Sequence, residues 1–197
     1  MKKPAALATF LFALGTVASG EIWKIDPDHT EVRAYWDHAG FSEQSLEFTE
    51  VDGSLEFSLD SVPDSRAFFS IPVASMETGV ERFNNDLWSS TFFDAETYPT
   101  ISFNSTAFRQ TAPMKVEVTG DLTIKDVTRE AKFDVTVHNV GEHPVGKFFE
   151  QFKGKWLGVT AVATIRRSEW DMGAFVPIGS DEIRIEINSE LKEESPD

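Results

Sequence analysis

The chain has 197 residues, no cysteine, and a formal net charge of −15 at pH 7 from 33 acidic and 18 basic side chains. This length favours one domain, large enough to bury a core or enclose a cavity, and the missing cysteines exclude disulfides, thiolate metal sites and a lipidated cysteine anchor. The acidic balance disfavours nucleic acid as a partner and disfavours attraction to anionic membrane surfaces.

Residues 1–20 have the layout of a secretory signal peptide. Lys2 and Lys3 precede an apolar run over 5–18, and the small residues Ser19 and Gly20 follow. The run is too short to span a bilayer. It therefore predicts export, with cleavage near Ser19 or Gly20 and no stable membrane anchor, and a buried N-terminal helix is the alternative.

From Glu21 onward the sequence predicts short strands separated by turns. Residues 30–36 and 53–59 alternate between apolar and polar side chains, which is the pattern of half-buried strands. A further strand is expected over 67–73, where Pro72 suits a strand end or an edge. One apolar and one polar face along each strand predict a mostly antiparallel sheet.

The stretch 75–106 interrupts this strand pattern with clustered aromatic residues. Its large apolar residues recur at helical spacings before Tyr98-Pro99 ends any helix, and Ile101 then resumes a strand. One or two helical turns are therefore expected inside a β protein. They form a lid or end cap that presents Phe83, Leu87, Trp88, Phe92 and Phe93.

Strands resume in the C-terminal half of the chain. They are expected over 115–123, 131–137, 157–165 and 182–188, each with regular alternation. Gly120 interrupts the first of them, which is typical of a bulge or of a close backbone approach.

The domain is predicted to span 21–191, with a charged tail over 192–197. About eight short strands suit an all-β sandwich or barrel. Seventeen Phe and five Trp need burial or a ligand. An eight-stranded barrel can be filled by its own side chains or hold one slender ligand, and the alternation alone leaves both open.

No catalytic motif of a nucleotide-binding, hydrolytic or zinc enzyme occurs, so a non-enzyme without a cofactor is predicted. His138 and His143 bracket a turn that contains Glu142. These three residues could form a metal site, or they could be solvated loop residues. His29 and His38 are expected to make hydrogen bonds.

Arg166-Arg167 is the one adjacent basic pair after the proposed signal peptide. The pair could be a solvated strand end beside acids, or it could contact a phosphate at a barrel mouth, for which the forked donors of arginine are suited. Arg82 has the same two interpretations.

The chain resembles the YceI-like family in several motifs that follow one another in family order. Residues 25–30, IDPDHT, are similar to the family's opening I-D-x-x-H-S, and VTGDLTI at 118–124 is similar to its T-G-D-L-T-I. The stretch 75–106 and the closing segment 165–183 also match. The resemblance implies an elongated, eight-stranded, antiparallel, lipocalin-like barrel with the helical segment near one end. It further implies a periplasmic protein whose apolar lumen holds a polyisoprenoid or a prenylated quinone.

Inward apolar side chains would then bind the ligand, and polar side chains at the mouth would contact its head group. The predicted ligand-binding residues are Trp36, Phe41, Phe83, Leu87, Trp88, Phe92, Phe93, Phe103, Phe133, Val135, Ala161 and Ala163. The predicted head-group contacts are His38, Arg82, Asp86 and Arg166.

One departure from the family pattern bears on the head group. Many members have R-D-x-H-L where this chain has FNNDL at 83–87, so Asp86 replaces a histidine. A carboxylate near the mouth would repel phosphate, which favours a neutral-headed ligand such as a quinone.

The lumen is expected to dominate affinity, because one five-carbon isoprene unit at about 0.8 kcal/mol per methylene contributes roughly 3–4 kcal/mol before ordering costs. The predicted function is carriage or storage of an isoprenoid lipid in the periplasm. The alternatives are an envelope stress or interaction protein with a filled barrel, and a metal-dependent enzyme. The oligomeric state, a homodimer included, stays open.

Overall fold

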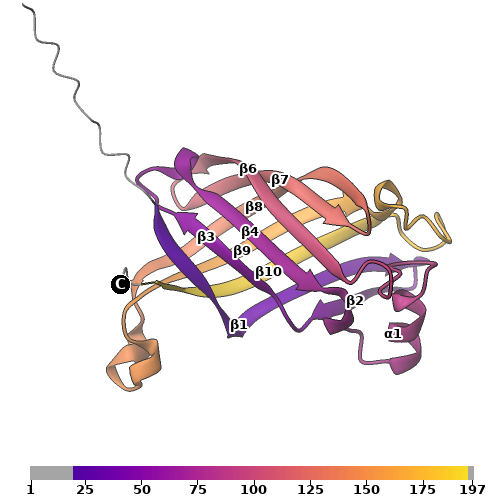
Figure 1. The fold of residues 1–197 in the computed structure, drawn as a ribbon, viewed down its shortest axis with the longest axis horizontal. Helices are drawn as coiled ribbons and strands as arrows, with labels where there is room; N and C mark the ends of the chain where they lie inside the picture. Colours follow the sequence, from indigo (N-terminus) through magenta and orange to yellow (C-terminus); the bar gives the residue numbers. More distant parts are fainter. Residues whose placement is uncertain (1–19, 195–197) are drawn as a thin grey trace, which may run out of the picture.

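Eight antiparallel strands close into a barrel in the computed structural model, which describes residues 20–194. The predicted signal peptide, apart from Gly20, and the last three residues lie outside this range. Strand β1 pairs with both β3 and β10, and this double pairing closes the sheet (Figure 1). The predicted eight-stranded barrel is therefore confirmed. Around the barrel the strands are β1 (Glu21–His38), β10 (Glu182–Glu193), β9 (Lys155–Arg166), β8 (Val127–Glu142), β7 (Lys115–Ile124), β6 (Thr100–Ala112), β4 (Arg66–Pro72) and β3 (Asp52–Phe57).

Two extra strands, β2 (Ser42–Phe48) and β5 (Met76–Glu77), extend the sheet beside the second half of β1. β1 pairs with three strands because residues 21–24 lie beside β3 and residues 32–38 lie beside β2, while β10 follows its other edge. The register against β10 shifts between Ile25 and Thr30. Residues 26–29, within the IDPDHT motif, therefore form an irregular bend in β1. The sequence did not indicate β2, because SEQSLEF carries only two large apolar residues.

The alternation predicted in the sequence corresponds to the inside and outside of the barrel. In β8, Ala131, Phe133 and Val137 are buried while Lys132 and Asp134 are exposed. The strands are longer than predicted, because ladder pairing continues across polar residues that break the alternation. Lys192 and Glu193, which were expected in a tail, lie in β10 opposite Lys24 and Trp23.

Gly120 has the close backbone approach that the sequence predicted. A Cβ atom placed there would lie 2.4 Å from the Phe103 ring and 2.5 Å from the Asn104 carbonyl oxygen. Beside it, the pairing of β6 with β7 shifts register between Ser105 and Ala107. The Phe103 ring then packs edge-on against Phe133 at 5.2 Å, so the glycine makes room for an aromatic pair in the core.

One α-helix, α1 (Glu81–Trp88), lies beside one end of the barrel within the predicted helical stretch (Figure 1). Buried Asn84 fixes its start, since its side chain accepts hydrogen bonds from Thr78 N at 2.9 Å and Thr78 Oγ1 at 2.6 Å and donates to Glu77 at 2.8 Å. Within residues 20–194 no helix has the length and apolar character to cross a membrane. In the same described range there are five short 3-10 helices: η1 (Val62–Asp64), η2 (Val73–Ser75), η3 (Pro144–Lys147), η4 (Glu150–Phe152) and η5 (Arg167–Trp170).

Candidate functional site in the barrel lumen

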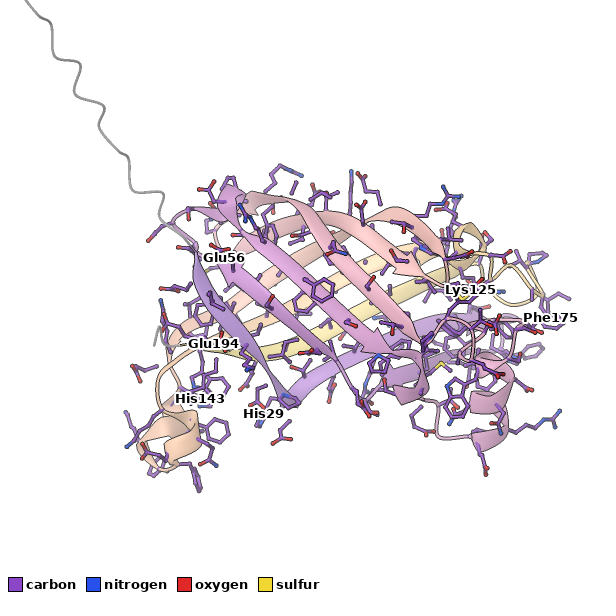
Figure 2. The ribbon with its side chains drawn as sticks, in the orientation of Figure 1. His29, Glu56, Lys125, His143, Phe175 and Glu194 are labelled. Atoms are coloured by element: carbon purple, nitrogen blue, oxygen red, sulfur yellow. The ribbon has the colours of Figure 1, made fainter. Side chains whose placement is uncertain are left out.

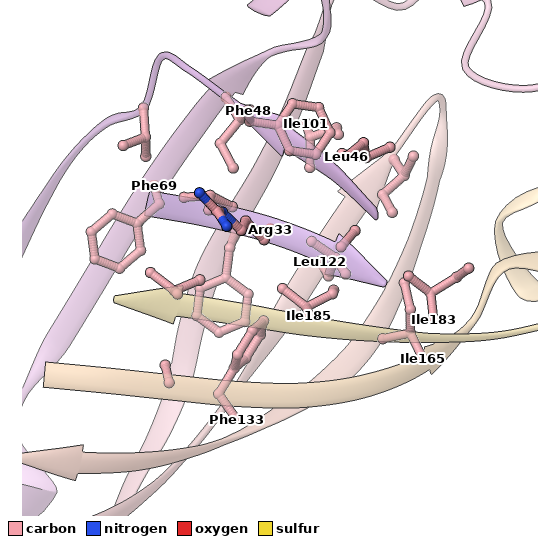
Figure 3. A pocket seen from close by; sticks show the side chains of 18 of the residues that line it. Arg33, Leu46, Phe48, Phe69, Ile101, Leu122, Phe133, Ile165, Ile183 and Ile185 are labelled. Carbon is pink, nitrogen blue, oxygen red and sulfur yellow. The ribbon is translucent and has the colours of Figure 1, made fainter. Parts of the chain in front are cut away.

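The barrel encloses a cavity of about 740 Å³. Apolar side chains of all eight barrel strands line it, and Figure 3 shows aromatic and branched aliphatic groups converging from the surrounding wall. This volume lies within the range of small-molecule and cofactor sites, about 300–1,000 Å³. The structure therefore differs from the alternative in which side chains fill the lumen.

Most of the predicted ligand-binding residues line this cavity. Some of them lie on the inward faces of the barrel strands. The others belong to α1 or to the turns that follow it. The lining members of the predicted set are Trp36, Phe83, Leu87, Phe92, Phe93, Phe103, Phe133, Val135 and Ala161.

Three predicted ligand-binding residues lie elsewhere. Phe41 is 91% exposed, because Ala39 and Gly40 take positive φ angles in the turn before it, and the side chain lies outside the cavity. Trp88, the last residue of α1, is partly buried against the core outside the cavity lining, and its indole nitrogen donates to the Val73 carbonyl at 3.2 Å. Ala163 is buried on the same face of β9 as Ala161, but it is not among the residues that line the cavity.

The mouth of the cavity lies between α1, the β1–β2 turn and the loop over residues 171–181. His38 and Asp86, two of the predicted head-group contacts, line the cavity at this end. Arg82 and Arg166, which were predicted beside them, are exposed and do not line the cavity.

Arg167, the neighbour of Arg166, lines the cavity, as does Arg33 of β1, whose guanidinium lies 3.1 Å from Glu47 and 3.7 Å from Glu31 (Figure 3). The guanidinium of Arg167 donates hydrogen bonds to the carbonyl oxygens of Ser180 at 2.8 Å, Gly179 at 3.2 Å and Met172. Burial lowers the pKa of its guanidinium below the ordinary value. Because backbone carbonyls occupy these donors, Arg167 holds the mouth loop in place and offers few donors to a ligand.

The alternation of β9 could have identified Arg167. Val159, Ala161 and Ile165 face the lumen, and two residues further along the same face is Arg167. Phe175 and Ile178 also line the cavity, but they belong to a loop without periodicity, so no pattern in the sequence marked them.

The opposite end of the barrel is closed by packed aromatic groups. Trp23 is fully buried, and its indole nitrogen donates to the Phe57 carbonyl at 3.0 Å. Outside it, the loop over residues 143–154 places His143 in a stack with Phe152 at 5.0 Å and edge-on to Trp156 at 5.3 Å. Figure 2 shows His143 and Phe175 at opposite ends of the molecule.

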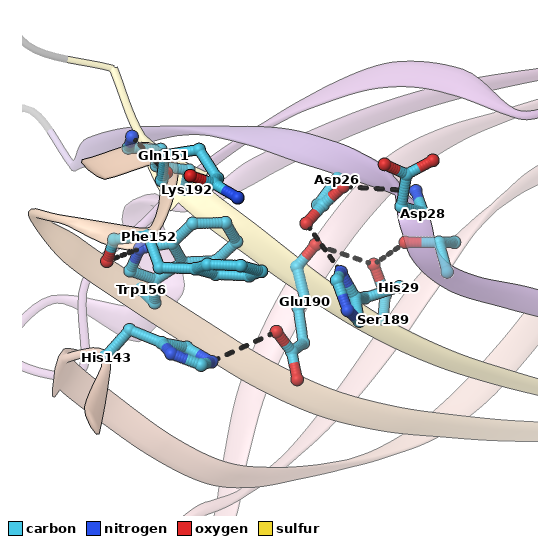
Figure 4. Close-up of polar contacts among 11 residues, drawn as sticks. Asp26, Asp28, His29, His143, Gln151, Phe152, Trp156, Ser189, Glu190 and Lys192 are labelled. Carbon is cyan, nitrogen blue, oxygen red and sulfur yellow. Dashed lines mark hydrogen bonds and ion pairs between the residues drawn. The ribbon is translucent and has the colours of Figure 1, made fainter. Parts of the chain in front are cut away.

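Polar side chains near the closed end form pairs (Figure 4). His29 Nδ1 lies 2.8 Å from Asp26 Oδ2, and this hydrogen bond raises the pKa of His29 above its ordinary value of 6.5. His143 Nε2 lies 3.4 Å from Glu190 Oε2. The pairs surround the bend in β1, so the histidine of the IDPDHT motif bonds to the aspartate of the same motif.

The metal site considered for His138, His143 and Glu142 does not assemble in this structure. His138 Nε2 lies 2.8 Å from Thr160 Oγ1, while His143 turns toward Glu190. Over residues 20–194 no three His, Asp or Glu side chains are grouped so that they could hold a metal ion.

Comparison with known proteins gives a consistent result for the whole domain. A family profile described as "YceI-like domain" matches residues 23–191. A UPF0312 protein of Pseudomonas putida is 28% identical over 167 residues, which cover 84% of this chain and 83% of that protein. Protein YceI of Salmonella arizonae is 25% identical over 93% of both chains.

Solved structures share the fold. The crystal structure of Burkholderia cenocepacia BcnA aligns with a TM-score of 0.74 and 25% identity, over 84% of this chain and 98% of that one. The Campylobacter jejuni YceI protein aligns at 0.69 and 22% identity, over 81% and 90%. A domain from Saccharophagus degradans described as polyisoprenoid binding aligns at 0.66 and 12% identity, over 87% and 98%.

Proposed function

Because the chain belongs to the YceI-like family, we propose that its barrel binds the prenyl chain of an isoprenoid lipid in the lumen and carries or stores that lipid in the periplasm. The polyisoprenoid-binding description of the Saccharophagus degradans domain, which shares the fold, supports the ligand class. The export layout of residues 1–20 supports the compartment.

The observation that carries the proposal is the apolar lumen itself. It is about 740 Å³ in volume, and it is lined by aliphatic and aromatic side chains from the whole circumference of the barrel. Burial of hydrocarbon is non-directional and scales with apolar area, so such a cavity favours a long hydrocarbon chain over a polar metabolite.

The volume of the cavity also limits how many isoprene units of a prenyl chain fit inside the barrel. At the packing density of protein interiors, about 0.74, a five-carbon isoprene unit occupies about 115 Å³, so the lumen has room for about six units. Longer prenyl chains would leave their remaining units at the mouth.

A neutral head group fits the mouth better than a phosphate. Asp86 adds a carboxylate there, while Arg82 and Arg166 lie outside the cavity and Arg167 is bonded to backbone carbonyls. A carboxylate repels an anionic head group. Arg167 donates to backbone carbonyls, and the charge of Arg33, which also lines the cavity, is already paired with Glu31 and Glu47. We therefore favour a prenylated quinone over a polyprenyl phosphate.

The test is purification of the protein from a bacterial envelope, organic extraction, and mass spectrometry of the extract. The expected result is an isoprenoid lipid in an amount comparable to the protein. Ala161→Phe, which places a ring inside the lumen, should lower that amount, and Phe148→Ser, on the exposed loop at the closed end, should not. Recovery of no isoprenoid lipid from either the wild type or Phe148→Ser would contradict the proposal.

A further inference from the structure

Two loops at the mouth of the barrel expose large apolar side chains. Phe41 in the β1–β2 turn is 91% exposed, and Phe175 and Ile178 in the loop over residues 171–181 are 69% and 73% exposed. The loops touch through a backbone bridge between His38 and Gly179. The bridge brings the two loops together at the mouth, and their exposed apolar side chains are here called the apolar collar: Phe41, Phe175, Val176 and Ile178.

The part of the collar in residues 172–180 has no charged side chains, although charged residues are common in the rest of the chain. Residues 172–180, MGAFVPIGS, contain no ionisable side chain, although 26% of the chain is Asp, Glu, Lys or Arg. The acids that flank this loop have partners: Asp181 accepts hydrogen bonds from Ser168 N at 2.9 Å and Ser168 Oγ at 2.8 Å, and Asp171 lies 3.3 Å from Lys125. The acids beside Phe41 are also paired, since Asp37 accepts a hydrogen bond from Gly40 N at 2.7 Å and Glu43 lies 3.0 Å from Arg184.

The collar is continuous with the inside of the barrel. Phe175 and Ile178 line the cavity and are also exposed to solvent at its mouth. The Phe175 ring lies 6.2 Å from the ring of Phe92, which lines the cavity beneath it. A hydrocarbon chain leaving the lumen would therefore pass along apolar side chains to the outer surface.

We infer that the apolar collar inserts into the surface of a lipid bilayer with neutral headgroups and thereby opens the mouth toward the membrane. This inference rests on the proposed function, because a lumen that holds a lipid must exchange it with a lipid phase. Bulk charge does not supply the attraction, since the chain carries a net charge of −15 and would be repelled by anionic headgroups.

A second copy of the chain fits the collar less well than a bilayer does. From the exposed fractions of its four side chains, the collar offers about 500 Å² of apolar surface, whereas a stable dimer buries about 800 Å² on each partner. The collar side chains sit on projecting loops, a shape suited to insertion into a fluid interface.

The test is flotation of the full mature chain with vesicles of phosphatidylcholine. Wild type should float with the vesicles, and the fraction bound should persist at 1 M NaCl and fall when anionic lipid is added, as expected for insertion by apolar side chains. Phe41→Ser should weaken binding about tenfold, an amount set by the transfer of one phenyl side chain from water. Phe148→Ser is the matched control, because Phe148 is 80% exposed at the opposite end and should leave binding unchanged.

The inference is overturned if wild type does not float, if the two variants lose binding equally, or if sedimentation shows a dimer that Phe41→Ser dissociates while no vesicle binding occurs. Phe41 does not line the cavity, so Phe41→Ser should still bind a prenylated quinone in detergent solution. Retained quinone binding with weakened flotation supports the collar. Failure of wild type to bind any prenyl compound, with flotation intact, would instead contradict the proposed function.

Discussion

The two ends of the barrel are built in opposite ways. At the closed end Trp23 has no exposed surface, its indole bonds to a backbone carbonyl, and Lys155 lies 5.6 Å from its ring and pairs with Glu21. At the mouth, one helix of eight residues and two loops leave Phe175 and Ile178 largely exposed. The packed end therefore stabilises the folded barrel. The other end leaves apolar side chains exposed to solvent, where a ligand would enter the lumen.

The largest expected effect is at the closed end. Trp23→Ala should lower the free energy of unfolding by about 3–5 kcal/mol, because it opens a cavity and leaves the Phe57 carbonyl without its partner. Phe175→Ala, at the exposed mouth, should change it by less than about 1 kcal/mol. Urea unfolding followed by circular dichroism measures both, and equal losses would contradict the contrast between the ends.

The wall between the two ends should respond to added volume. Gly120→Ala should lower the free energy of unfolding by about 1–3 kcal/mol, because the added Cβ would overlap Phe103 and the backbone of Asn104. The control is Gly158→Ala in β9, where the nearest atom is 4.0 Å away, and a change within about 0.5 kcal/mol is expected. Thermal unfolding measures the stability of both variants. If Gly158→Ala is destabilised as much as Gly120→Ala, the close contact at Gly120 does not explain the loss.

A local loosening of the mouth is expected from Asn84→Ala. The substitution removes the acceptor of Thr78 and the donor to Glu77, and the loss of these part-buried hydrogen bonds should lower the free energy of unfolding by about 1–2 kcal/mol. Hydrogen exchange should accelerate over residues 76–93 and stay unchanged around Trp23. Asn85→Ala, at the exposed neighbouring position, is the control and should leave both regions as they are. Faster exchange at Trp23 would mean that the ends are not independent.

The smallest effects are those of pH, and they have opposite signs at the two ends. The hydrogen bond from Asn84 lowers the pKa of Glu77 below 4.5, and the backbone hydrogen bond from Ser168 lowers the pKa of Asp181 below 3.8. Their contributions are present above those ordinary values and are lost as pH falls through the depressed values. The raised pKa of His29 has the reverse consequence, because its contribution is complete below 6.5 and is lost as pH rises through the folded value.

These effects should be small because the groups are exposed and screened. Hydrogen exchange should show the mouth loosening in acid and the β1 bend loosening in mild alkali. Glu77→Gln should reduce the acid response, and His29→Gln should remove the alkaline one. The same pH response at both ends would contradict the assignment of these groups.

Much of the wall could be predicted from the sequence, because each strand buries one face and a period of two makes that face readable. Phe103 and Phe133 were placed in the lumen for this reason. The same rule carried through Ile165 would have placed Arg167 inside and Arg166 outside.

The mouth could not be predicted in the same way. Phe41 was expected in the lumen, but the positive φ angles of Ala39 and Gly40 decide where the turn directs it. Phe175 and Ile178 reach the cavity only because Arg167 and the bridge from His38 to Gly179 fold their loop across the end of the barrel. The volume of the lumen depends on the packing of all eight strands together, which no local pattern contains.

The most direct test of the lumen as the binding site is titration of the tryptophan fluorescence of the wild type and Ala161→Phe with prenylated quinones of increasing chain length. Wild-type affinity should rise at least tenfold with each added isoprene unit up to about six units and then level off, because each unit buries hydrocarbon until the lumen is full. Ala161→Phe should level off at a shorter chain. An affinity set by the quinone head alone, equal for all chain lengths, would contradict the lumen as the site of binding.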